Sequence, residues 1–262
     1  MCALAPETRT PNAHMPMSSD AFSYSGNELE NFSAAVHWKA YWGSEIAPFL
    51  GDEVLELGAG LGATARALNH RPYRKWVGLE PDLGMCQQVE RMLGQGELPA
   101  GYAIRNGTSR DLGADEVFDT ILYIDVLEHI EHDREELQRV ARHLVDGGHI
   151  VIVAPAHNFL YTEFDRKIGH HRRYNKALLR AAVPAPLRIR KMHYLDSVGM
   201  LASLANRLVL KSDSPSAGQI RLWDSVMVRA SRWVVDALTL HRLGKSIVCI
   251  LEKETPSAQA SP

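Results

Sequence analysis

Short apolar runs alternate along this chain with segments of helical periodicity. Apolar runs of strand length occur at 54–57, 76–80, 102–104, 118–125, 149–154, 189–194 and 246–251. The connections between the first five runs are long enough for helical crossovers, and such crossovers predict a parallel sheet with helices on both faces. Asp82 and Asp133 are placed to cap two of these helices. We therefore predict an α/β fold, in which ligands bind beyond the carboxyl ends of the strands.

Helical periodicity also extends on both sides of the predicted core. Leu29, Phe32, Val36 and Ala40 fall on one helical face before the first strand. A second helical face, between the sixth and seventh strands, comprises Ile220, Trp223, Met227, Ala230, Val234 and Ala237. We expect a tail at 1–20, a helical cap at 21–50, a core at 51–195, a helical insertion or lid at 196–243, a final strand within 244–253 and a tail at 254–262.

The segment EVLELGAGLGATARAL, from Glu53 to Leu68, combines a buried strand, a glycine turn and the start of a helix. Gly58, Gly60 and Gly62 have no Cβ, so the backbone can adopt positive φ and a ligand can lie directly against it. The helix that follows directs its free N–H groups toward the turn. Because Glu56 places a carboxylate inside the motif, we expect a cationic or zwitterionic ligand there and not a pyrophosphate.

Glu80 ends the second predicted strand, where a carboxylate can accept both hydroxyls of a ribose. With the glycine turn and Glu56, this layout resembles class I S-adenosylmethionine-dependent methyltransferases. The resemblance implies a Rossmann-like, doubly wound seven-stranded sheet whose final strand is antiparallel beside the fifth and sixth. It also implies S-adenosyl-L-methionine as cofactor, bound by Glu56, Gly58, Ala59, Gly60, Gly62, Glu80, Pro81, Thr108, Asp125 and Val126.

Two of these implied contacts depend on the loops after the third and fourth strands. Many members of the family carry an acid after the glycine of the adenine loop, whereas this chain has Thr108 there and Asp111 three residues later, so either side chain is a candidate. The fourth strand ends in D-V-L-E-H-I, beginning at Asp125, as the family's fourth strand does. His129 in this segment is a candidate general base, but we favour a structural role in holding the loop.

The polar stretch from Asn158 to Tyr174, NFLYTEFDRKIGHHRRY, follows the fifth strand. Its G-H-x-R-R-Y run resembles a bacterial subgroup of type 11/12-like methyltransferases, in which this loop opens onto the acceptor pocket. We predict His170 as a catalytic base, with Arg173 and Tyr174 in acceptor binding. Tyr161 and Asp165 are weaker candidates for the same site.

A structural alternative exists for this stretch: Asp165 and the arginines form internal ion pairs that fix the loop, while Arg172 and His171 are solvated. Metal binding by His157, Asp165, His170 and His171 is disfavoured, because adjacent histidines rarely ligate one ion. We expect no metal. The insertion at 196–243 either roofs the acceptor site, as is common in this superfamily, or forms a dimer interface.

Composition narrows the partners of the protein. The formal net charge of −2, from 29 basic and 31 acidic side chains, gives no overall field for nucleic acid or an anionic membrane. Cys2, Cys86 and Cys249 lack metal or disulfide spacing. With no apolar run of membrane-spanning length and no signal pattern, we expect a cytoplasmic protein. We expect a monomer or homodimer, and the resemblance implies that it methylates oxygen or nitrogen of a small molecule. The rival functions are a non-catalytic cofactor-binding protein and an NAD(P)-linked oxidoreductase, the latter disfavoured by Glu56.

Overall fold

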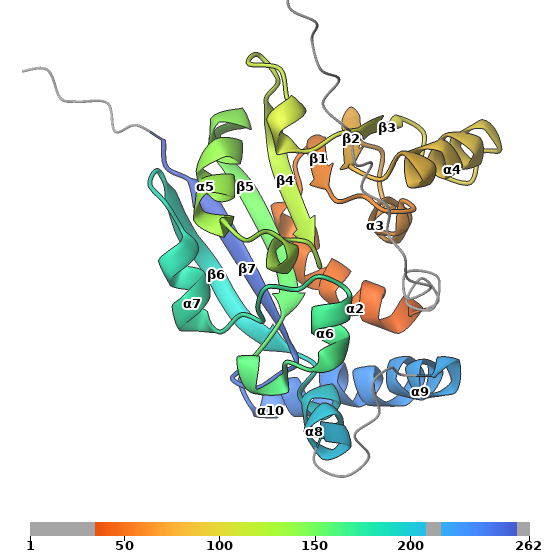
Figure 1. The fold of residues 1–262 in the computed structure, drawn as a ribbon, viewed down its shortest axis with the longest axis vertical. Helices are drawn as coiled ribbons and strands as arrows, with labels where there is room; N and C mark the ends of the chain where they lie inside the picture. The colour runs from red at the N-terminus through yellow and green to blue at the C-terminus, as the bar shows by residue number, and fades with distance from the viewer. Residues whose placement is uncertain (1–34, 208–215, 256–262) are drawn as a thin grey trace, which may run out of the picture.

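The computed structural model describes residues 35–207 and 216–255, in which seven strands form one sheet in the order β3-β2-β1-β4-β5-β7-β6 (Figure 1). This confirms the predicted Rossmann-like α/β architecture. The strands are β1 (Glu53–Leu57), β2 (Lys75–Glu80), β3 (Tyr102–Asn106), β4 (Phe118–Ile124), β5 (Leu144–Pro155), β6 (Leu187–Leu195) and β7 (Ser246–Lys253). The predicted tail at 1–20, the first part of the helical cap and residues 256–262 lie outside the described residues.

Strands β1 to β5 are parallel, and β7 is antiparallel to both of its neighbours. Ile152 of β5 pairs with Cys249 of β7, which in turn pairs with Met192 of β6. The antiparallel final strand was predicted, and it places Ser246, at the start of β7, at the end of the sheet where the parallel strands finish. The carboxyl ends of the parallel strands and the residues before β7 therefore share one edge of the molecule.

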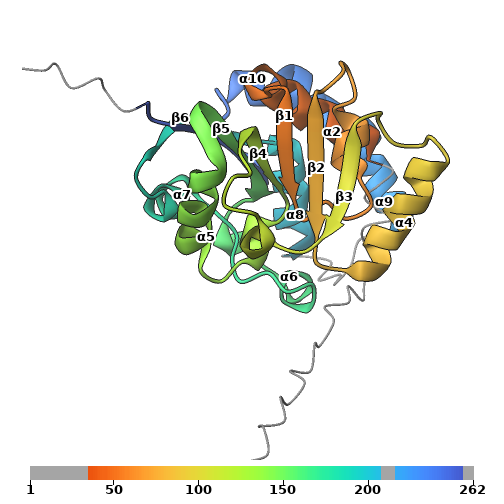
Figure 2. The same ribbon diagram turned by 90° about the horizontal axis from the view of Figure 1, so that it is seen from above.

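Helices cover both faces of the sheet (Figure 2). On one face, α5 and α7 bury Leu137 and Leu179 in a cluster with the strands. On the other, α2 and α4 contribute Trp42 and Val89 to a second cluster. These layered helices are α2 (Val36–Ile46), α3 (Ala63–Ala67), α4 (Leu83–Gly94), α5 (Asp133–Val140) and α7 (Lys176–Ala182), and a short helix α6 (Glu163–Lys167) follows β5. As predicted, the Asp82 side chain caps α4 by accepting a hydrogen bond from the Met85 N–H.

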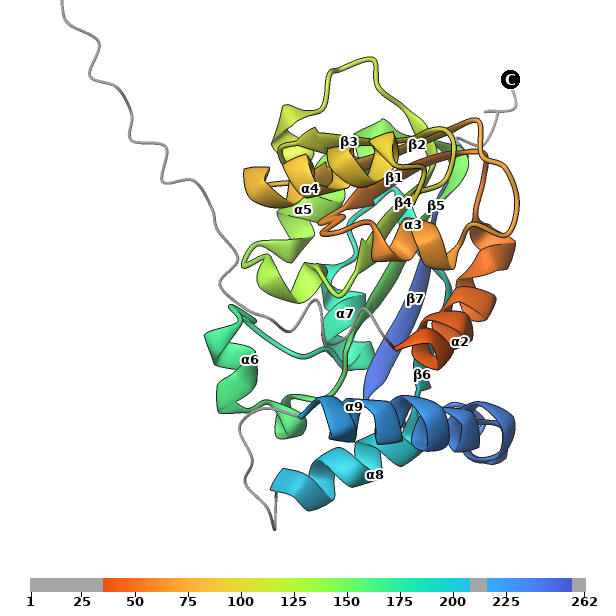
Figure 3. The ribbon, with the colours of Figure 1, turned by 90° about the vertical axis from the view of Figure 1, so that its right-hand side faces the viewer.

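The described parts of the segment between β6 and β7 are helical, and they lie together near the carboxyl ends of the parallel strands (Figure 3). It consists of α8 (Ser197–Ala205), α9 (Ala217–Leu222), the π-helical turns Trp223–Val228 and Ser231–Val235, and α10 (Asp236–Leu238). Asp224 accepts from the backbone N–H of Trp38 at 2.8 Å, and Asp236 accepts from the hydroxyl of Tyr41 at 2.7 Å. These buried contacts join α2 to the insertion. Among the described residues, no helix combines the length and the apolar character that a membrane crossing requires.

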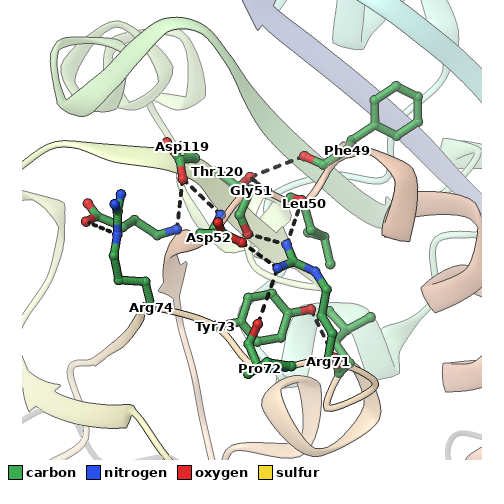
Figure 4. A network of polar contacts seen from close by, with 12 residues as sticks. Phe49, Leu50, Gly51, Asp52, Arg71, Pro72, Tyr73, Arg74, Asp119 and Thr120 are labelled. Carbon is green, nitrogen blue, oxygen red and sulfur yellow. Dashed lines mark hydrogen bonds and ion pairs between the residues drawn. The ribbon is translucent and has the colours of Figure 1, made fainter.

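At the opposite end of the sheet, the loop before β1 is tied to β4 (Figure 4). One carboxylate oxygen of Asp119 accepts from the N–H groups of Asp52 and Glu53, both at 2.9 Å. A Cβ on Gly51 would lie 2.2 Å from the Cβ of Asp119, so the close approach of loop and strand requires glycine. This network fixes the start of β1 at the end of the sheet opposite to the carboxyl ends of the parallel strands.

Two local expectations differ from the structure. Strand β5 begins at Leu144 rather than at residue 149, because Leu144 is buried and pairs with Phe118, and the two glycines at 147 and 148 lie within the strand. The helix α5 begins with Asp133 as its first helical residue, and its carboxylate binds other side chains instead of capping the helix.

Candidate active site

A cavity of about 610 Å³ opens at the carboxyl ends of β1, β2, β4 and β5. Its lining includes the predicted residues Gly58, Gly60, Glu80, Pro81, Asp125, Val126, His170 and Arg173. They come from four separate segments of the chain, and the parallel topology brings them to one edge. The sequence-based expectation that ligands bind beyond the strand ends therefore matches the position of the cavity.

The glycine turn adopts the backbone that its sequence requires. Gly58, Gly60 and Gly62 have φ values of 65°, 52° and 70°, which are strained for any other residue. A Cβ on Gly58 would meet Val126 Cγ2 at 2.5 Å, whereas a Cβ on Gly60 would meet nothing within 4 Å. Gly60 thus leaves open space at the bend, on the side where the cavity lies.

Glu80 faces the cavity and is already bound by the backbone. The N–H of Gly60 donates to Oε2 at 2.8 Å, and the N–H of Asp82 donates to Oε1 at 2.9 Å. Each carboxylate oxygen has a further lone pair, so both can still accept a hydroxyl. Burial raises the pKa of Glu80, and the two backbone hydrogen bonds oppose that rise.

Glu56 lies deeper than predicted, behind the turn. It is 2% exposed, outside the cavity lining, and its Oε2 accepts from the indole N–H of Trp76 at 3.1 Å. Burial raises the pKa of Glu56 to about 7, although hydrogen bonds from Thr64 and Trp76 act to lower it. The structure therefore places Glu56 beneath the turn, where its oxygens do not line the cavity.

The remaining predicted cofactor-binding residues lie in two places, the glycine turn and the loop after β3. Ala59 and Gly62 are buried in the turn, and a Cβ on Gly62 would meet Leu98 Cδ2 at 2.9 Å. Thr108 and Asp111, the two adenine-loop candidates, bind each other: the N–H of Thr108 donates to Asp111 Oδ2 at 2.8 Å. None of these four residues lines the cavity. Met85, which carried no sequence signal, does line it beside Pro81.

Asp165 is the centre of the polar stretch after β5. Its carboxylate is 1% exposed and accepts from Nε and Nη2 of Arg173 at 2.8 and 2.9 Å. Its Oδ1 lies 3.0 Å from Nδ1 of His170. Although burial acts to raise the pKa of Asp165, hydrogen bonds from His170 and Arg173 hold it well below the ordinary value. The predicted structural alternative is thus confirmed for this ion pair, and Arg173 directs its guanidinium at Asp165.

Tyr174 and Arg172 occupy different positions from those predicted. Tyr174 is fully buried, outside the cavity lining, and its hydroxyl donates to Asp133 Oδ2 at 2.7 Å. The same oxygen accepts from Nη1 of Arg172 at 2.8 Å. This corrects two expectations: Tyr174 is committed to a structural contact instead of facing an acceptor, and Arg172 is paired instead of solvated. Tyr161 donates its hydroxyl to the carbonyl of His170 at 2.6 Å and so supports the loop.

The E-H pair after β4 lies beside His170. His129 lines the cavity, and its ring meets that of His170 edge to face with centroids 4.5 Å apart. Burial, with the neighbouring His170, lowers the pKa of His129 to about 4, so its imidazole is neutral near pH 7. Glu128 is fully buried, and burial, with the nearby charge of Asp125, raises its pKa well above the ordinary value.

The far side of the cavity comes from segments that carried no motif. Ser203 of α8, Trp223 and Lys245 line it. Nζ of Lys245 lies 3.8 Å from the ring centroid of Trp223 and 3.9 Å from Oδ2 of Asp196. Burial lowers the pKa of Lys245, and Asp196 opposes that change. One feature of the sequence indicated that Lys245 lies here. Lys245 directly precedes the predicted strand at 246–251, and this antiparallel strand begins at the end of the sheet where the cavity lies.

Comparisons with known proteins agree with this geometry. Residues 55–150 match the family model of a methyltransferase domain. A proposed sarcosine dimethylglycine methyltransferase from Galdieria sulphuraria gives a TM-score of 0.56 at 18% identity, over 84% of both chains. The [4+2]-cyclase SpnF gives 0.57 at 15% identity, over 82% of this chain and 81% of that one. An S-adenosylmethionine-dependent methyltransferase from Clostridium acetobutylicum gives 0.53 at 11% identity, over 84% and 92%. No curated protein matches the sequence.

At these identities the structural likeness shows a shared fold. The matched domain spans the glycine turn, Glu80 and Asp125, and the strand order with an antiparallel β7 is that of the matching structures. Residues 55–150 therefore match a methyltransferase domain, and the chain has the fold of class I S-adenosylmethionine-dependent methyltransferases, which implies S-adenosylmethionine as the cofactor.

Proposed function

We propose that this protein transfers the methyl group of S-adenosylmethionine to oxygen or nitrogen of a small-molecule acceptor. The observation that carries the proposal is the continuity of one cavity from Gly60 and Glu80 to His170 and Trp223. Such a cavity has a cofactor end, built on the glycine turn, and a second end, built from α6 and the insertion. A donor and an acceptor bound at these ends would face each other within a single cavity.

The cofactor end follows the sequence-based assignment. Glu80 is proposed to accept the ribose hydroxyls, because its oxygens are held in place by two N–H groups and keep lone pairs free. Gly60 and Asp125 are proposed to pass close to the methionine part. Asp125 has a φ of 54° and its N–H donates to the carbonyl of Val153 at 2.8 Å, so its backbone is fixed at the cavity wall.

Transfer from a sulfonium requires mainly alignment of the acceptor with the methyl group. The acceptor atom forms a bond to the methyl carbon, the carbon–sulfur bond breaks, and its electron pair stays on sulfur. The acceptor also loses a proton, and His170 is proposed to take it. Asp165 holds Nδ1 of the ring and Nε2 remains for the acceptor, an arrangement suited to proton transfer.

The acceptor end of the cavity also contains charged side chains that could select the acceptor. Arg173 is committed to Asp165 by two hydrogen bonds, so Lys245 is the proposed partner for an anionic group of the acceptor. Phe164 and Trp223 supply apolar surface beside it. These contacts favour an acceptor with a ring or chain and one negative charge.

The proposal is tested by titration and by labelled transfer. Calorimetry with S-adenosylhomocysteine and with NADP⁺ should show binding of the first alone. Cell extract incubated with the protein and methyl-labelled cofactor should yield a labelled product that is missing in extract without the protein. Binding without transfer to any component would favour a non-catalytic role. The fold alone does not decide this, since the [4+2]-cyclase SpnF has a similar structure.

We also propose a cytoplasmic location, in keeping with Cys86 and Cys249, which are free and buried. We also propose that the protein is a monomer or a homodimer. In a homodimer, the outer side of the insertion would form the interface. Trp233, Leu238 and Leu240 are exposed there, at 71%, 78% and 69%. Light scattering on the purified chain distinguishes the two states.

A further inference from the structure

Glu128, His129 and His170 form a cluster of ligand-type side chains at the cavity wall. One ligand atom from each side chain lies within 4.8 Å of the ligand atoms of the other two. Among residues 35–207 and 216–255, these three form the group of His, Cys, Asp or Glu side chains that is spaced closely enough to bind one metal ion. All three side chains line the cavity. The set shares only His170 with the side chains that the sequence disfavoured as metal ligands, because the fold brings the loop after β4 against the loop after α6.

Glu128 is the unusual member of this cluster. Its side chain is 0% exposed, and neither carboxylate oxygen has a hydrogen-bond partner. Nε2 of His170 lies 3.8 Å from Oε1, which is too long for a hydrogen bond. A buried carboxylate without a donor is strongly unfavourable, so this position calls for a bound partner.

The orientation of His170 fits a metal ligand. Asp165 binds Nδ1 at 3.0 Å and is itself held by Arg173. A carboxylate on one ring nitrogen fixes the tautomer and leaves the lone pair of the other nitrogen for a metal. That second nitrogen, Nε2, is the atom that faces Glu128. The backbone of Gly169 similarly interacts with the ring of His129.

We propose that Glu128, His129 and His170 bind one first-row divalent cation at the acceptor end of the cavity. Two imidazoles and one carboxylate suit Zn²⁺, Mn²⁺, Fe²⁺ or Co²⁺, and they leave coordination positions open. With bonds of about 2.1 Å, ligand atoms around one ion lie about 3–3.5 Å apart. The three side chains therefore close in by about an ångström when the ion binds.

This proposal rests on the proposed function and narrows it to oxygen acceptors. The open positions take a hydroxyl oxygen of the acceptor, and the cation makes that hydroxyl more acidic. Its proton leaves to water, the metal-bound oxygen forms a bond to the methyl carbon, and the carbon–sulfur bond breaks with its electron pair on sulfur. His170 then serves as a ligand, and the cation replaces it as the group that promotes proton loss.

Cobalt binding to the full, tag-free and metal-stripped chain tests the site directly. We expect one Co²⁺ per chain, detected by calorimetry and by visible absorption of a nitrogen- and oxygen-ligated ion. Glu128→Gln, which keeps the shape of the side chain, and His129→Ala should each raise the Kd for Co²⁺ at least about 100-fold. Asp165→Asn should raise it about 10–100-fold through the orientation of His170. His132→Ala removes an exposed histidine three residues from His129 and should leave the Kd unchanged.

The absence of stoichiometric Co²⁺ binding, or equal affinity in Glu128→Gln and wild type, would overturn the proposal. Circular dichroism of each variant identifies any that fails to fold, and Glu128→Gln is the least disruptive. S-adenosylhomocysteine is titrated into the same metal-stripped protein. Its binding with no Co²⁺ site refutes the metal proposal alone, and its failure to bind refutes the proposed function whatever the cobalt result.

Discussion

The carboxylate of Glu80 accepts a hydrogen bond from the backbone N–H of Gly60 at 2.8 Å, so the second strand holds the bend that follows the first. One side chain thereby positions the glycine turn and presents its remaining lone pairs to the cavity. Its removal has two consequences, a looser turn and a lost acceptor for a ribose.

Glu80→Ala should weaken S-adenosylhomocysteine binding about 10–100-fold, because hydrogen bonds to a charged acceptor contribute about 1.5–3 kcal/mol. Calorimetry at fixed pH measures the change. Glu90→Ala, on the exposed face of α4, is the matched control and should bind as wild type does. Equal affinities for Glu80→Ala and wild type would contradict the ribose assignment.

Gly60→Ala should weaken cofactor binding because the added methyl group projects into open space beside the cavity. Gly96→Ala is the control: Gly96 also has positive φ, at 74°, and a Cβ there also meets nothing within 4 Å, but it lies outside the cavity lining. Both variants carry a backbone strain of about 1–2 kcal/mol. Urea unfolding should therefore show similar destabilisation, while calorimetry should show lost affinity for Gly60→Ala alone. Equal affinity in the two variants would mean that the cofactor lies elsewhere.

His170→Ala should lower kcat about 10²–10⁴-fold, because the ring either takes the acceptor proton itself or holds the cation that promotes its loss. The Kd for S-adenosylhomocysteine should stay within about twofold, because the ring lies at the acceptor end of the cavity. Turnover is measured with labelled cofactor and the acceptor found in extract, and His132→Ala serves as the control. Unchanged turnover would remove His170 from the reaction.

Arg173→Met should destabilise the fold by about 3 kcal/mol at pH 7, because it leaves the buried carboxylate of Asp165 without its main partner. Arg166→Met removes an exposed arginine whose partner is Glu163 and should be close to neutral. Hydrogen bonds keep the pKa of Asp165 low in the folded state, so its contribution is present above the ordinary value of 3.8 and is lost as pH falls. Urea unfolding should show the difference between Arg173→Met and wild type shrinking below pH 4. A constant difference would show that Arg173 acts by packing.

Glu56→Gln should stabilise the cofactor-free protein above pH 7. Burial raises the pKa of Glu56 to about 7 from 4.5, so between these values the unfolded chain ionises while the folded chain keeps its proton. Wild-type stability should fall relative to Glu56→Gln across this window, by about 3 kcal/mol in total, and the two proteins should converge below pH 4.5. Thermal melts from pH 4 to 8 measure this, with Glu97→Gln as an exposed control. Parallel pH curves would show that Glu56 ionises normally in the fold.

The strands and the cofactor end of the cavity could be predicted because local sequence specifies them. Gly58 and Gly60 need positive φ, and an acid at the end of a strand, such as Glu80, or directly after it, such as Asp125, lies at a known edge of a parallel sheet. Periodicity also indicated the helix through Ile220 in the insertion.

The acceptor end was less predictable, because its contacts join residues far apart in the chain. Arg172 and Tyr174 both bind Asp133, which the local pattern had indicated as a helix cap. Glu128 reads as one half of an E-H pair, and only the packing of α6 shows that it is buried beside His170 without a donor. Lys245 reaches the cavity because β7 runs against the other strands.

The same reversal of β7 has a consequence for synthesis of the protein. Strand β7, made after every other strand described, lies between β5 and β6, and β6 has no other neighbour in the sheet. A nascent chain that has not yet reached Ser246 therefore carries two unpaired strand edges as it leaves the ribosome. This half of the sheet is completed only after Lys253 has emerged, and therefore after the glycine turn and its neighbouring strands have become available for folding.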